Sequence, residues 1–355
     1  MRIGIMTFHN AINYGAVLQA YALRTYLSRM MPHDDVSIID YRCKKIADGY
    51  RIFAFQRERS FARTLLFNAL RLFYVPYNIR NRIHFCNFIQ NNLPCVKPKN
   101  LDDYDCIVYG SDQIWNQNLT GNDLCYFGAG YSKKKIAYAA SDGKSLVISE
   151  EIAYLLDSYL AIGCREKSLC VALSQKYPGK SVKTVCDPVF LLGKDEWGKI
   201  ALPVRKKSFI LVYKIGDSDL IDKAAEKLRM ETGKKVIQIC YRRSLRKWFI
   251  KNQNVRTAVH PRVFLGYIQN ADLVCTTSFH GTALSIIFEK DFYTFQIQKN
   301  EERITCLLEA VGLSERYIDF IPESGGNTLL YSDNVREKFA RYREASLQFL
   351  KGVLK

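Results

Sequence analysis

Residues 3–41, IGIMTFHNAINYGAVLQAYALRTYLSRMMPHDDVSIIDY, contain one complete unit of alternating strand and helix. The apolar run Ile3–Met6 predicts a strand, the polar stretch Thr7–Tyr14 predicts a loop, and Gly15–Leu23 predicts a helix with few charges. A second apolar run, Val36–Tyr41, predicts the next strand. This order of strand, helix and strand is typical of a parallel α/β sheet.

The same alternation continues through most of the chain. Apolar runs predict further strands at residues 105–109, 135–140, 161–164 and 184–186, and then at 209–213, 235–239, 271–275 and 292–295. Polar and basic residues from Trp197 to Lys207 separate the two series and predict a linker. We therefore predict one domain over residues 1–198 and a second over 205–330, with ligand loops where the strands end.

Two other segments are predicted to be helical. Residues 42–100 have apolar residues at mostly helical spacing, with arginines between them and Pro76 as an interruption. This pattern predicts a helical insertion in the first domain, with one basic face. Residues 331–355 are predicted to form a terminal amphipathic helix after Ser332, a residue type that caps helices. Its apolar positions are Val335, Phe339, Tyr342 and Phe349.

Part of the insertion has the composition of a helix that binds membranes. Residues 51–73 combine arginines with aromatic and leucine residues: Arg51, Arg57, Arg59, Arg63 and Arg71 with Phe53, Phe55, Phe61, Leu65 and Leu66. A basic amphipathic helix of this kind can lie on an anionic leaflet. Alternatively, the aromatic residues pack on the first domain and the arginines face water. The sequence leaves both interpretations open.

The composition favours an anionic partner. The 355 residues include 52 Lys and Arg against 35 Asp and Glu, which gives a formal charge of +17. No helix-turn-helix, RNP or zinc-finger pattern accompanies these charges, so nucleic acid is not expected as a partner. The 11 cysteines form no C-x-x-C pair and predict buried thiols rather than a metal site. Without a signal-peptide pattern or a run of about 20 apolar residues, we expect a cytoplasmic protein.

Residues 275–285, CTTSFHGTALS, are the most informative stretch for function. An apolar strand ends, small hydroxyl residues follow, and a helix is predicted to begin near Gly281. His280 would lie at the helix N-terminus, where free backbone N–H groups favour an anion. Gly281 would let a ligand approach the backbone closely. The alternative is that His280 only caps the helix or fills a pocket, but the small residues around it favour a functional role.

Three other strand ends carry polar residues. Asn10–Ala16 follows the first strand, and its glycine resembles a phosphate-binding turn while its asparagines suit sugar hydroxyls; an ordinary turn before a helix fits equally well. Gly110–Asn116 contains Asp, Gln and Asn side chains that could bind the hydroxyls of a carbohydrate, and an indole that could cover its ring. Alternatively, Asp112 caps a helix and Trp115 packs in the core. Arg165–Ser168 places either a cation at a strand end or a local ion pair at the start of a surface helix.

Together, these segments resemble the polysaccharide pyruvyl transferase family. The matching segments occur in the family's order: Asn13–Gln19, Tyr104-Asp105, Gly110–Asn116, Tyr138–Ser141, Arg165–Ser168, Asp187-Pro188 and Ser278–Thr282. The resemblance implies two Rossmann-like domains facing a cleft, as in the GT-B glycosyltransferases. It also implies transfer of pyruvate from phosphoenolpyruvate to two hydroxyls of one sugar, giving a cyclic ketal, without a metal or another cofactor. Acceptors in the family are typically cell-envelope or capsular glycans, or their lipid-linked precursors.

The resemblance also assigns roles to residues. His280 and Arg165 are expected to hold or activate phosphoenolpyruvate, and Lys299, with Arg303 close by, is the nearest match to a lysine that some members use. Ser278 stands where some members have arginine, so one donor contact is missing or supplied elsewhere. The remaining residues expected to contact substrate lie in the same matching segments: Asn13, Gly15, Gln19, Ser111, Asp112, Gln113, Gly281 and Thr282.

Two rival functions remain open at this point. One is a GT-B glycosyltransferase that uses a nucleotide-sugar. Such an enzyme would be expected to have an acidic residue in its second domain that binds the ribose, and no clear candidate lies near His280. The other is a basic protein that binds anionic glycan or membrane without catalysis. We expect a pyruvyl transferase that works at the inner face of the cytoplasmic membrane on a lipid-linked or nascent polysaccharide.

Overall fold

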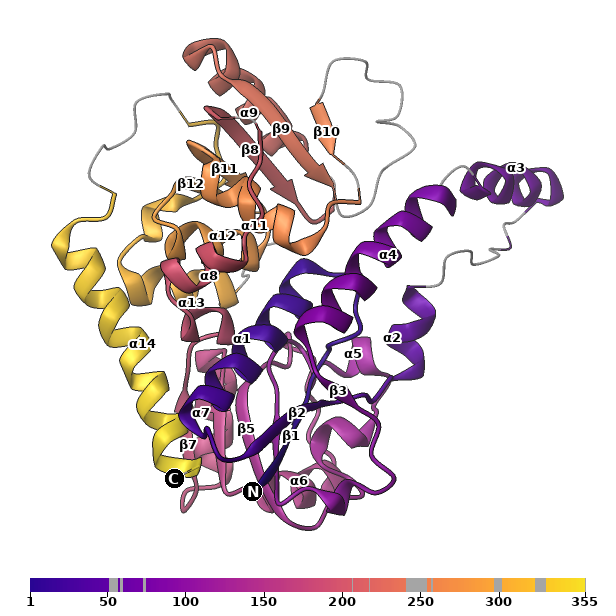
Figure 1. Ribbon diagram of the computed structural model, residues 1–355, viewed down its shortest axis with the longest axis vertical. Coiled ribbons are helices and arrows are strands. Elements are labelled where there is room, and N and C mark those ends of the chain that lie inside the picture. Colours follow the sequence, from indigo (N-terminus) through magenta and orange to yellow (C-terminus); the bar gives the residue numbers. More distant parts are fainter. Residues whose placement is uncertain are drawn as a thin grey trace.

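The computed structural model describes residues 1–50, 57, 60–72, 75–205, 207–216, 218–240, 254–256, 258–296, 302–322 and 330–354. Within these residues the strands form two parallel sheets, one from each half of the chain. In Figure 1 the first sheet occupies the lower part of the molecule and the second the upper part. Each sheet and the helices that cover it are called here the first unit and the second unit.

The first sheet has the strand order β3-β2-β1-β4-β5-β6-β7 in the described part of the chain. Every neighbouring pair is parallel, so each strand is followed by a crossover on one face of the sheet. The strands are β1 (Arg2–Met6), β2 (Asp35–Ile39), β3 (Cys95–Val96), β4 (Cys106–Tyr109), β5 (Lys134–Ala140), β6 (Ala161–Cys164) and β7 (Ser181–Thr184).

The second sheet repeats this plan with the order β10-β9-β8-β11-β12-β13, again parallel throughout the described residues. Its central strands are apolar on both faces because helices cover both sides, as is usual for parallel sheets. The strands are β8 (Phe209–Lys214), β9 (Lys235–Cys240), β10 (Asn254–Arg256), β11 (Leu273–Thr276), β12 (Asp291–Phe295) and β13 (Tyr317–Ile318).

The strand order reverses at one point in each sheet, between β1 and β4 and between β8 and β11. At such a point the crossovers leave in opposite directions, and the loops after the two strands separate into a crevice. The loops after these four strands face one another across the two units. In parallel sheets of this kind, ligands bind in the crevice at such a reversal point.

The two units share one hydrophobic core. Helix α1 (Tyr14–Met30) of the first unit and α11 (Pro261–Asn270) of the second contribute Val17, Leu18, Phe264 and Leu265 to it. The ring of Tyr14 stacks on that of Phe264 with centroids 4.2 Å apart, and its hydroxyl donates to the carbonyl of Val259 at 2.8 Å. The start of α1 is thereby anchored in the second unit.

The other helices lie on the faces of the sheets or connect the strands. In the first unit they are α2 (Lys44–Gly49), α3 (Phe61–Leu72), α4 (Val75–Asn92), α5 (Gln117–Thr120), α6 (Glu150–Asp157), α7 (Lys167–Lys176) and α8 (Lys194–Ile200). In the second unit they are α9 (Asp219–Thr232), α12 (Phe279–Ile287) and α13 (Glu302–Val311). Short 3-10 turns occur at Leu101–Asp103, Leu124–Phe127, Pro188–Leu191 and Ser314–Arg316.

The last helix, α14 (Asp333–Leu354), runs from the second unit back to the first (Figure 1). The guanidinium of Arg343 donates to the carbonyls of Phe190 and Leu191 at 2.8 and 2.9 Å. The Ser346 hydroxyl accepts from the backbone N–H of Cys186 at 2.8 Å, and Leu350 is fully buried. This helix therefore completes the packing of the first unit.

The segment between β2 and β4 is helical, as predicted, but it also contains the edge strand β3, which the sequence did not predict. The prediction of a linker beginning at Trp197 was wrong at that residue, because Trp197 is fully buried within α8. Of the predicted aromatic stripe, Phe53 and Phe55 lie outside the described residues. Phe61 is 80% exposed, so this residue does not pack on the first domain as one of the two alternatives had it.

No helix in the described residues is both long enough and apolar enough to cross a membrane.

Candidate active site

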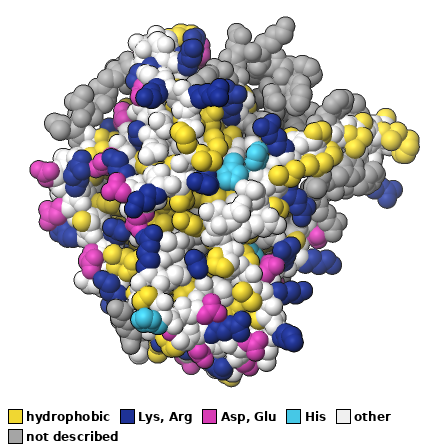
Figure 2. Space-filling view, viewed as in Figure 1, with side chains coloured by type: hydrophobic (Ala, Val, Ile, Leu, Met, Phe, Trp, Pro, Cys, Tyr) yellow, Lys and Arg dark blue, Asp and Glu magenta, His cyan; other side chains and the backbone are white. Residues whose placement is uncertain are grey.

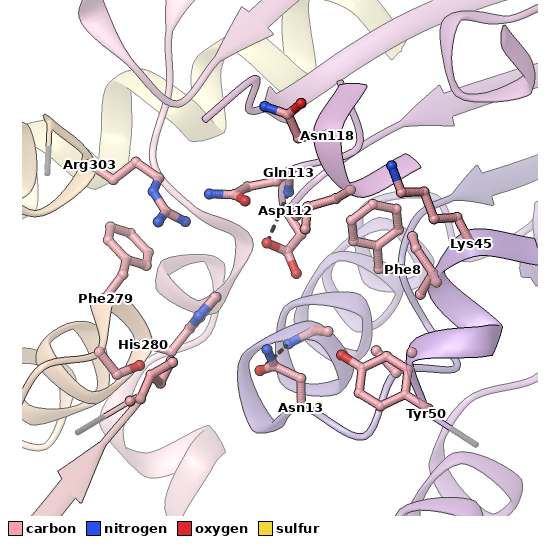
Figure 3. A pocket seen from close by; sticks show the side chains of 18 of the residues that line it. Phe8, Asn13, Lys45, Tyr50, Asp112, Gln113, Asn118, Phe279, His280 and Arg303 are labelled. Carbon is pink, nitrogen blue, oxygen red and sulfur yellow. Dashed lines mark hydrogen bonds between the residues drawn. The ribbon is translucent and has the colours of Figure 1, made fainter. Parts of the chain in front are cut away.

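A cleft of about 640 Å³ lies between the two units, at the edges where the strand order reverses. In Figure 3, Arg303, Phe279 and His280 lie on one side of it and Lys45, Tyr50 and Phe8 on the other, with Asp112 and Gln113 between them. The other side chains and backbone segments that line it belong to Ala11, Asn13, Ala16, Ile46, Gly49, Asn118, Leu119, Ile215, Gly216, Thr277 and Ser278.

Two helices point their N-termini at the cleft. Helix α1 is capped by Asn13, whose carboxamide oxygen accepts from the N–H of Gly15 at 2.9 Å, and α12 is capped by the hydroxyl of Ser278. Neither first turn contains an acidic residue. The positive ends of both helix dipoles therefore face the cleft with no acidic residue in their own first turns, which favours an anionic ligand.

The two helix ends meet where His280 contacts Gly15. A β-carbon built on Gly15 would lie 2.5 Å from Cγ of the imidazole, and closer still to Nδ1 and Cε1. Only glycine leaves room for this approach, because any side chain would occupy the position of the ring. Gly15 thus contacts the candidate catalytic histidine from the opposite unit without itself lining the cleft.

Asp187 connects the two units beneath the cleft. One of its oxygens, Oδ2, lies 3.5 Å from Nε2 of His280 and accepts from Nη1 of Arg165 at 2.6 Å and from the hydroxyl of Ser111 at 3.3 Å. The other, Oδ1, accepts from the backbone N–H of Val189 at 3.0 Å. Three hydrogen bonds, from Arg165, Ser111 and Val189, thus hold the carboxylate in place beside the imidazole of His280.

The charge on Asp187 is stabilised by its neighbours. Burial alone would raise the pKa of this carboxyl, but the imidazole of His280 and the guanidinium of Arg165 lower the pKa well below its usual value of 3.8. The folded structure thus favours the ionised form of Asp187. A buried carboxylate beside an imidazole stabilises the imidazolium that forms during proton transfer.

Arg165, which was expected to contact the donor, does not line the cleft in this structure. The residue is 3% exposed and lies behind Asp187, with its guanidinium carbon 5.0 Å from the ring centre of Phe279. Nη2 lies 3.7 Å from an oxygen of Asp112, which does line the cleft. Arg165 thus holds two carboxylates in place. Its Nε and Nη2 are buried without a hydrogen-bond partner among the described residues.

Arg303 brings a cation to the cleft from the first turn of α13. When the carboxamide oxygen of Gln113 faces the guanidinium, that oxygen accepts from Nη1 at 2.9 Å and from Nη2 at 3.1 Å. The preceding residue, Glu302, accepts from the backbone N–H and the hydroxyl of Ser168, both at 2.8 Å. Because Ser168 belongs to the first unit, this contact fixes the start of α13 across the cleft.

Among the described lining residues the cationic groups outnumber the anionic ones. Lys45, Arg303 and the titratable His280 face the cleft, and Asp112 is the carboxylate on this surface. The amides of Asn13, Gln113 and Asn118 add donors and acceptors beside the rings of Phe8 and Tyr50. Such a surface suits a small molecule with several negative charges together with a neutral polar molecule that has hydroxyl groups.

The other residues predicted for the site have supporting positions. Gln19 donates to Thr7 and to the carbonyl of Ala16, both at 2.9 Å, and is buried below the loop after β1. Ser111 contacts Asp187, and Thr282 bonds Thr294 at 2.7 Å inside the second unit. Gly281 packs so closely on Thr276 that a side chain would overlap its hydroxyl. Lys299 lies outside the described residues.

Asp187 and the lining residues Lys45 and Tyr50 of the insertion were not among the residues predicted for the site. Asp187-Pro188 was noted at a strand end, but an aspartate before proline is a common start of a turn, and its side chain does cap the turn Pro188–Leu191. Asp187 could have been predicted as a site residue from its place directly after a predicted strand, as for the other polar residues at strand ends. Nothing in the sequence marked Lys45 and Tyr50, since no motif surrounds them.

The sequence profile of the family described as polysaccharide pyruvyl transferase matches residues 13–297. The chain belongs to the polysaccharide pyruvyl transferase family. This membership implies an enzyme that acts as a transferase in the synthesis of polysaccharides. The matched residues include the described strands from β2 to β12 and every described residue that lines the cleft except Phe8, Ala11 and Arg303. Comparison with curated proteins finds no significant match.

Solved structures of other proteins have a fold similar to that of this chain. A co-structure of S. aureus MnaA with UDP is 10% identical, has a TM-score of 0.54, and covers 98% of this chain and 94% of that chain. UDP-N-acetylglucosamine 2-epimerase from Rickettsia bellii is 9% identical, has a TM-score of 0.51, and covers 100% of this chain and 96% of that chain. At these identities the similarity concerns the fold alone, and it confirms the predicted GT-B-like arrangement.

Proposed function

We propose that this cleft transfers pyruvate from phosphoenolpyruvate to two hydroxyls of one sugar and forms a cyclic ketal. The observation that carries the proposal is the His280–Asp187 pair at the base of a cation-lined cleft, in a chain that belongs to the pyruvyl transferase family. Phosphoenolpyruvate has a phosphate and a carboxylate close together, so its site needs several positive groups and few negative ones. The described lining residues meet this requirement.

The donor is proposed to bind on the side of the cleft formed by the second unit. The N-terminus of α12 and the guanidinium of Arg303 would bind its two anionic groups, as helix ends and arginines do in other anion sites. Ser278 stands at a position where some members of the family have arginine. Arg303 supplies a cation near that place from a different helix, which compensates for the missing side chain.

The reaction requires a proton at the methylene carbon. We assign its delivery to His280, because histidine is the side chain that most often acts as a general acid and this imidazole lies in the cleft, 3.5 Å from the carboxylate of Asp187. Protonation makes C2 of the donor electrophilic, the first sugar hydroxyl adds to C2, and the C2–O bond to phosphate breaks. The second hydroxyl then closes the ketal. Of the two protons that the hydroxyls lose, one replaces the proton given by His280 and one leaves with phosphate.

The acceptor is proposed to bind on the opposite side, beside Phe8, Tyr50 and Asn118. An aromatic ring covers the apolar face of a sugar, and the carboxamide of Asn118 can bind its hydroxyls. Lys45 would bind an anionic group that the acceptor carries, such as the diphosphate of a lipid-linked oligosaccharide. This assignment fits a cytoplasmic enzyme that modifies a cell-envelope or capsular precursor before export.

The test is phosphate release from phosphoenolpyruvate with a panel of acceptors that carry galactose, glucose or mannosamine. Turnover in D₂O should give a ketal methyl group with one deuterium, detected by NMR and mass spectrometry. An acceptor with one of the two hydroxyls methylated is the control and should give no ketal. If no acceptor supports phosphate release, and a UDP-sugar is consumed instead, the glycosyltransferase alternative is correct. The described lining of the second unit offers no carboxylate for a ribose, which favours the pyruvyl transfer.

A further inference from the structure

Helices α3 and α4 project from the body of the protein as an arm (Figure 1), and one side of this arm is apolar. Five large hydrophobic side chains on it are between 42% and 80% exposed: Phe61, Leu65, Leu72, Ile79 and Ile83. Within α3, Phe61, Leu65 and Leu72 recur at spacings of 4 and 7 residues, and within α4, Ile79 and Ile83 are 4 residues apart, so each helix carries its exposed hydrophobic residues on one face. Figure 2 shows hydrophobic side chains in a row along the arm to its tip.

The charges of the arm all have one sign. Residues 60–94 contain arginine at 63, 71, 80 and 82 and neither Asp nor Glu. Of these arginines, Arg80 and Arg82 are exposed beside Ile79 and Ile83. An exposed apolar stripe next to cations, with no acidic residue between, is the composition of helices that lie in the interface of an anionic bilayer.

We propose that the α3–α4 arm, residues 60–83, docks this protein on an anionic lipid bilayer. Its exposed hydrophobic side chains would enter the interface, and Arg80 and Arg82 would lie at the level of the lipid phosphates. The alternative occupant is a second copy of the chain. Two arms packed on each other would bring together the exposed Arg80 and Arg82 of both copies, and residues 60–94 contain no carboxylate to pair with them, so charge complementarity favours lipid.

The arm is attached beside the cleft. Lys45 and Tyr50, which line the cleft, come shortly before the arm in the chain, and α4 packs on α1 and α11 where the two units meet. A bilayer bound to the arm would therefore lie close to the side of the cleft that we assign to the acceptor. Docking on the arm would hold the cleft next to a substrate that is anchored in the same membrane.

The experiment is co-sedimentation of the full chain with vesicles, without phosphoenolpyruvate, so that it can fail while the transferase activity stands. Wild type should bind vesicles of phosphatidylcholine with 30% phosphatidylglycerol, and binding should fall at high salt. The variant Arg80→Gln/Arg82→Gln should bind at least about tenfold more weakly. Phe61→Ser/Leu72→Ser/Ile83→Ser should also lose at least about tenfold.

Matched controls change exposed residues away from the arm. Val147→Ser/Tyr154→Ser/Met230→Ser removes three hydrophobic side chains of similar exposure, and Lys199→Gln/Arg341→Gln removes the same charge. Both should bind like wild type. The proposal is overturned if wild type ignores the anionic vesicles, or if the controls lose as much binding as the arm variants. A dimer in sedimentation velocity that the triple arm variant abolishes, without vesicle binding, would instead assign the arm to a second copy.

Discussion

The imidazole of His280 lies against the backbone of Gly15, which belongs to the other unit, so two residues 265 positions apart form one surface at the base of the cleft. The contact leaves no space for a β-carbon on Gly15. The position of the imidazole to which we assign proton transfer and the contact between the two units thus depend on the same point. A small change there should affect the reaction more than the fold.

Gly15→Ala should reduce turnover at least about 100-fold, because the imidazole must move by the size of a methyl group and such displacements have effects of that order. Far-UV circular dichroism should stay unchanged. The control is Gly179→Ala, where a β-carbon would meet no atom within 4 Å. The measurement is the rate of phosphate release by both variants. A Gly15→Ala variant as active as Gly179→Ala would show that the contact between Gly15 and His280 is not needed for the reaction.

His280→Ala should lower turnover by at least about 100-fold, as expected for removal of a group that transfers a proton. Its thermal midpoint should stay near that of wild type, since Asp187 keeps its bond to Arg165. In D₂O, any residual product should still carry one deuterium, but form slowly. A variant with normal turnover would move the proton donor to another residue.

Arg165→Ala should lose activity for a different reason. It leaves the buried carboxylate of Asp187 without its cation, and breaking a buried pair in this way costs about 3–5 kcal/mol of unfolding free energy. Chemical denaturation should show this loss, in contrast to His280→Ala. Arg165→Lys should regain part of the stability. If Arg165→Ala were as stable as wild type yet inactive, direct contact with the donor would be the better role.

Arg303→Ala should raise the Michaelis constant for phosphoenolpyruvate about tenfold or more and lower turnover less, because it removes a charged hydrogen bond to the bound donor. Lys299→Ala should have the same kind of effect if that lysine also binds the donor. Steady-state kinetics of the two variants side by side show which cation is used. An unchanged constant in both would exclude the start of α13 from the donor site.

The pH dependence of stability should carry the signature of Asp187. Its pKa is lowered in the folded protein, so its stabilising effect is complete above the unfolded value of 3.8 and decreases as the pH falls below it. The stability difference between wild type and Asp187→Asn should therefore shrink by about 1 kcal/mol between pH 4 and pH 3. Urea unfolding of both proteins at pH 3, pH 4 and pH 6 measures this difference in unfolding free energy. A constant difference would mean that Asp187 has an ordinary pKa.

Much of the fold could be predicted because long apolar runs such as Cys106–Tyr109 and Phe209–Lys214 end in polar loops. The short strands β3, β10 and β13 have two or three residues and carry no such pattern. For the site, the sequence located the loops after β1, β4 and β11. It could not show that Arg165 points behind the cleft, because the direction of a side chain at a strand end depends on packing with distant segments.

The course of α14 has a consequence for how the protein is made. Ser346 and Leu350 fill the first unit from the far end of the chain, so this unit cannot complete its packing until the ribosome has synthesised residues 333–354. Until then, the first unit of the nascent chain exposes the apolar surface that α14 covers in the folded protein. A fragment that ends near residue 198 would share that defect permanently, and should aggregate or recruit chaperones rather than fold alone.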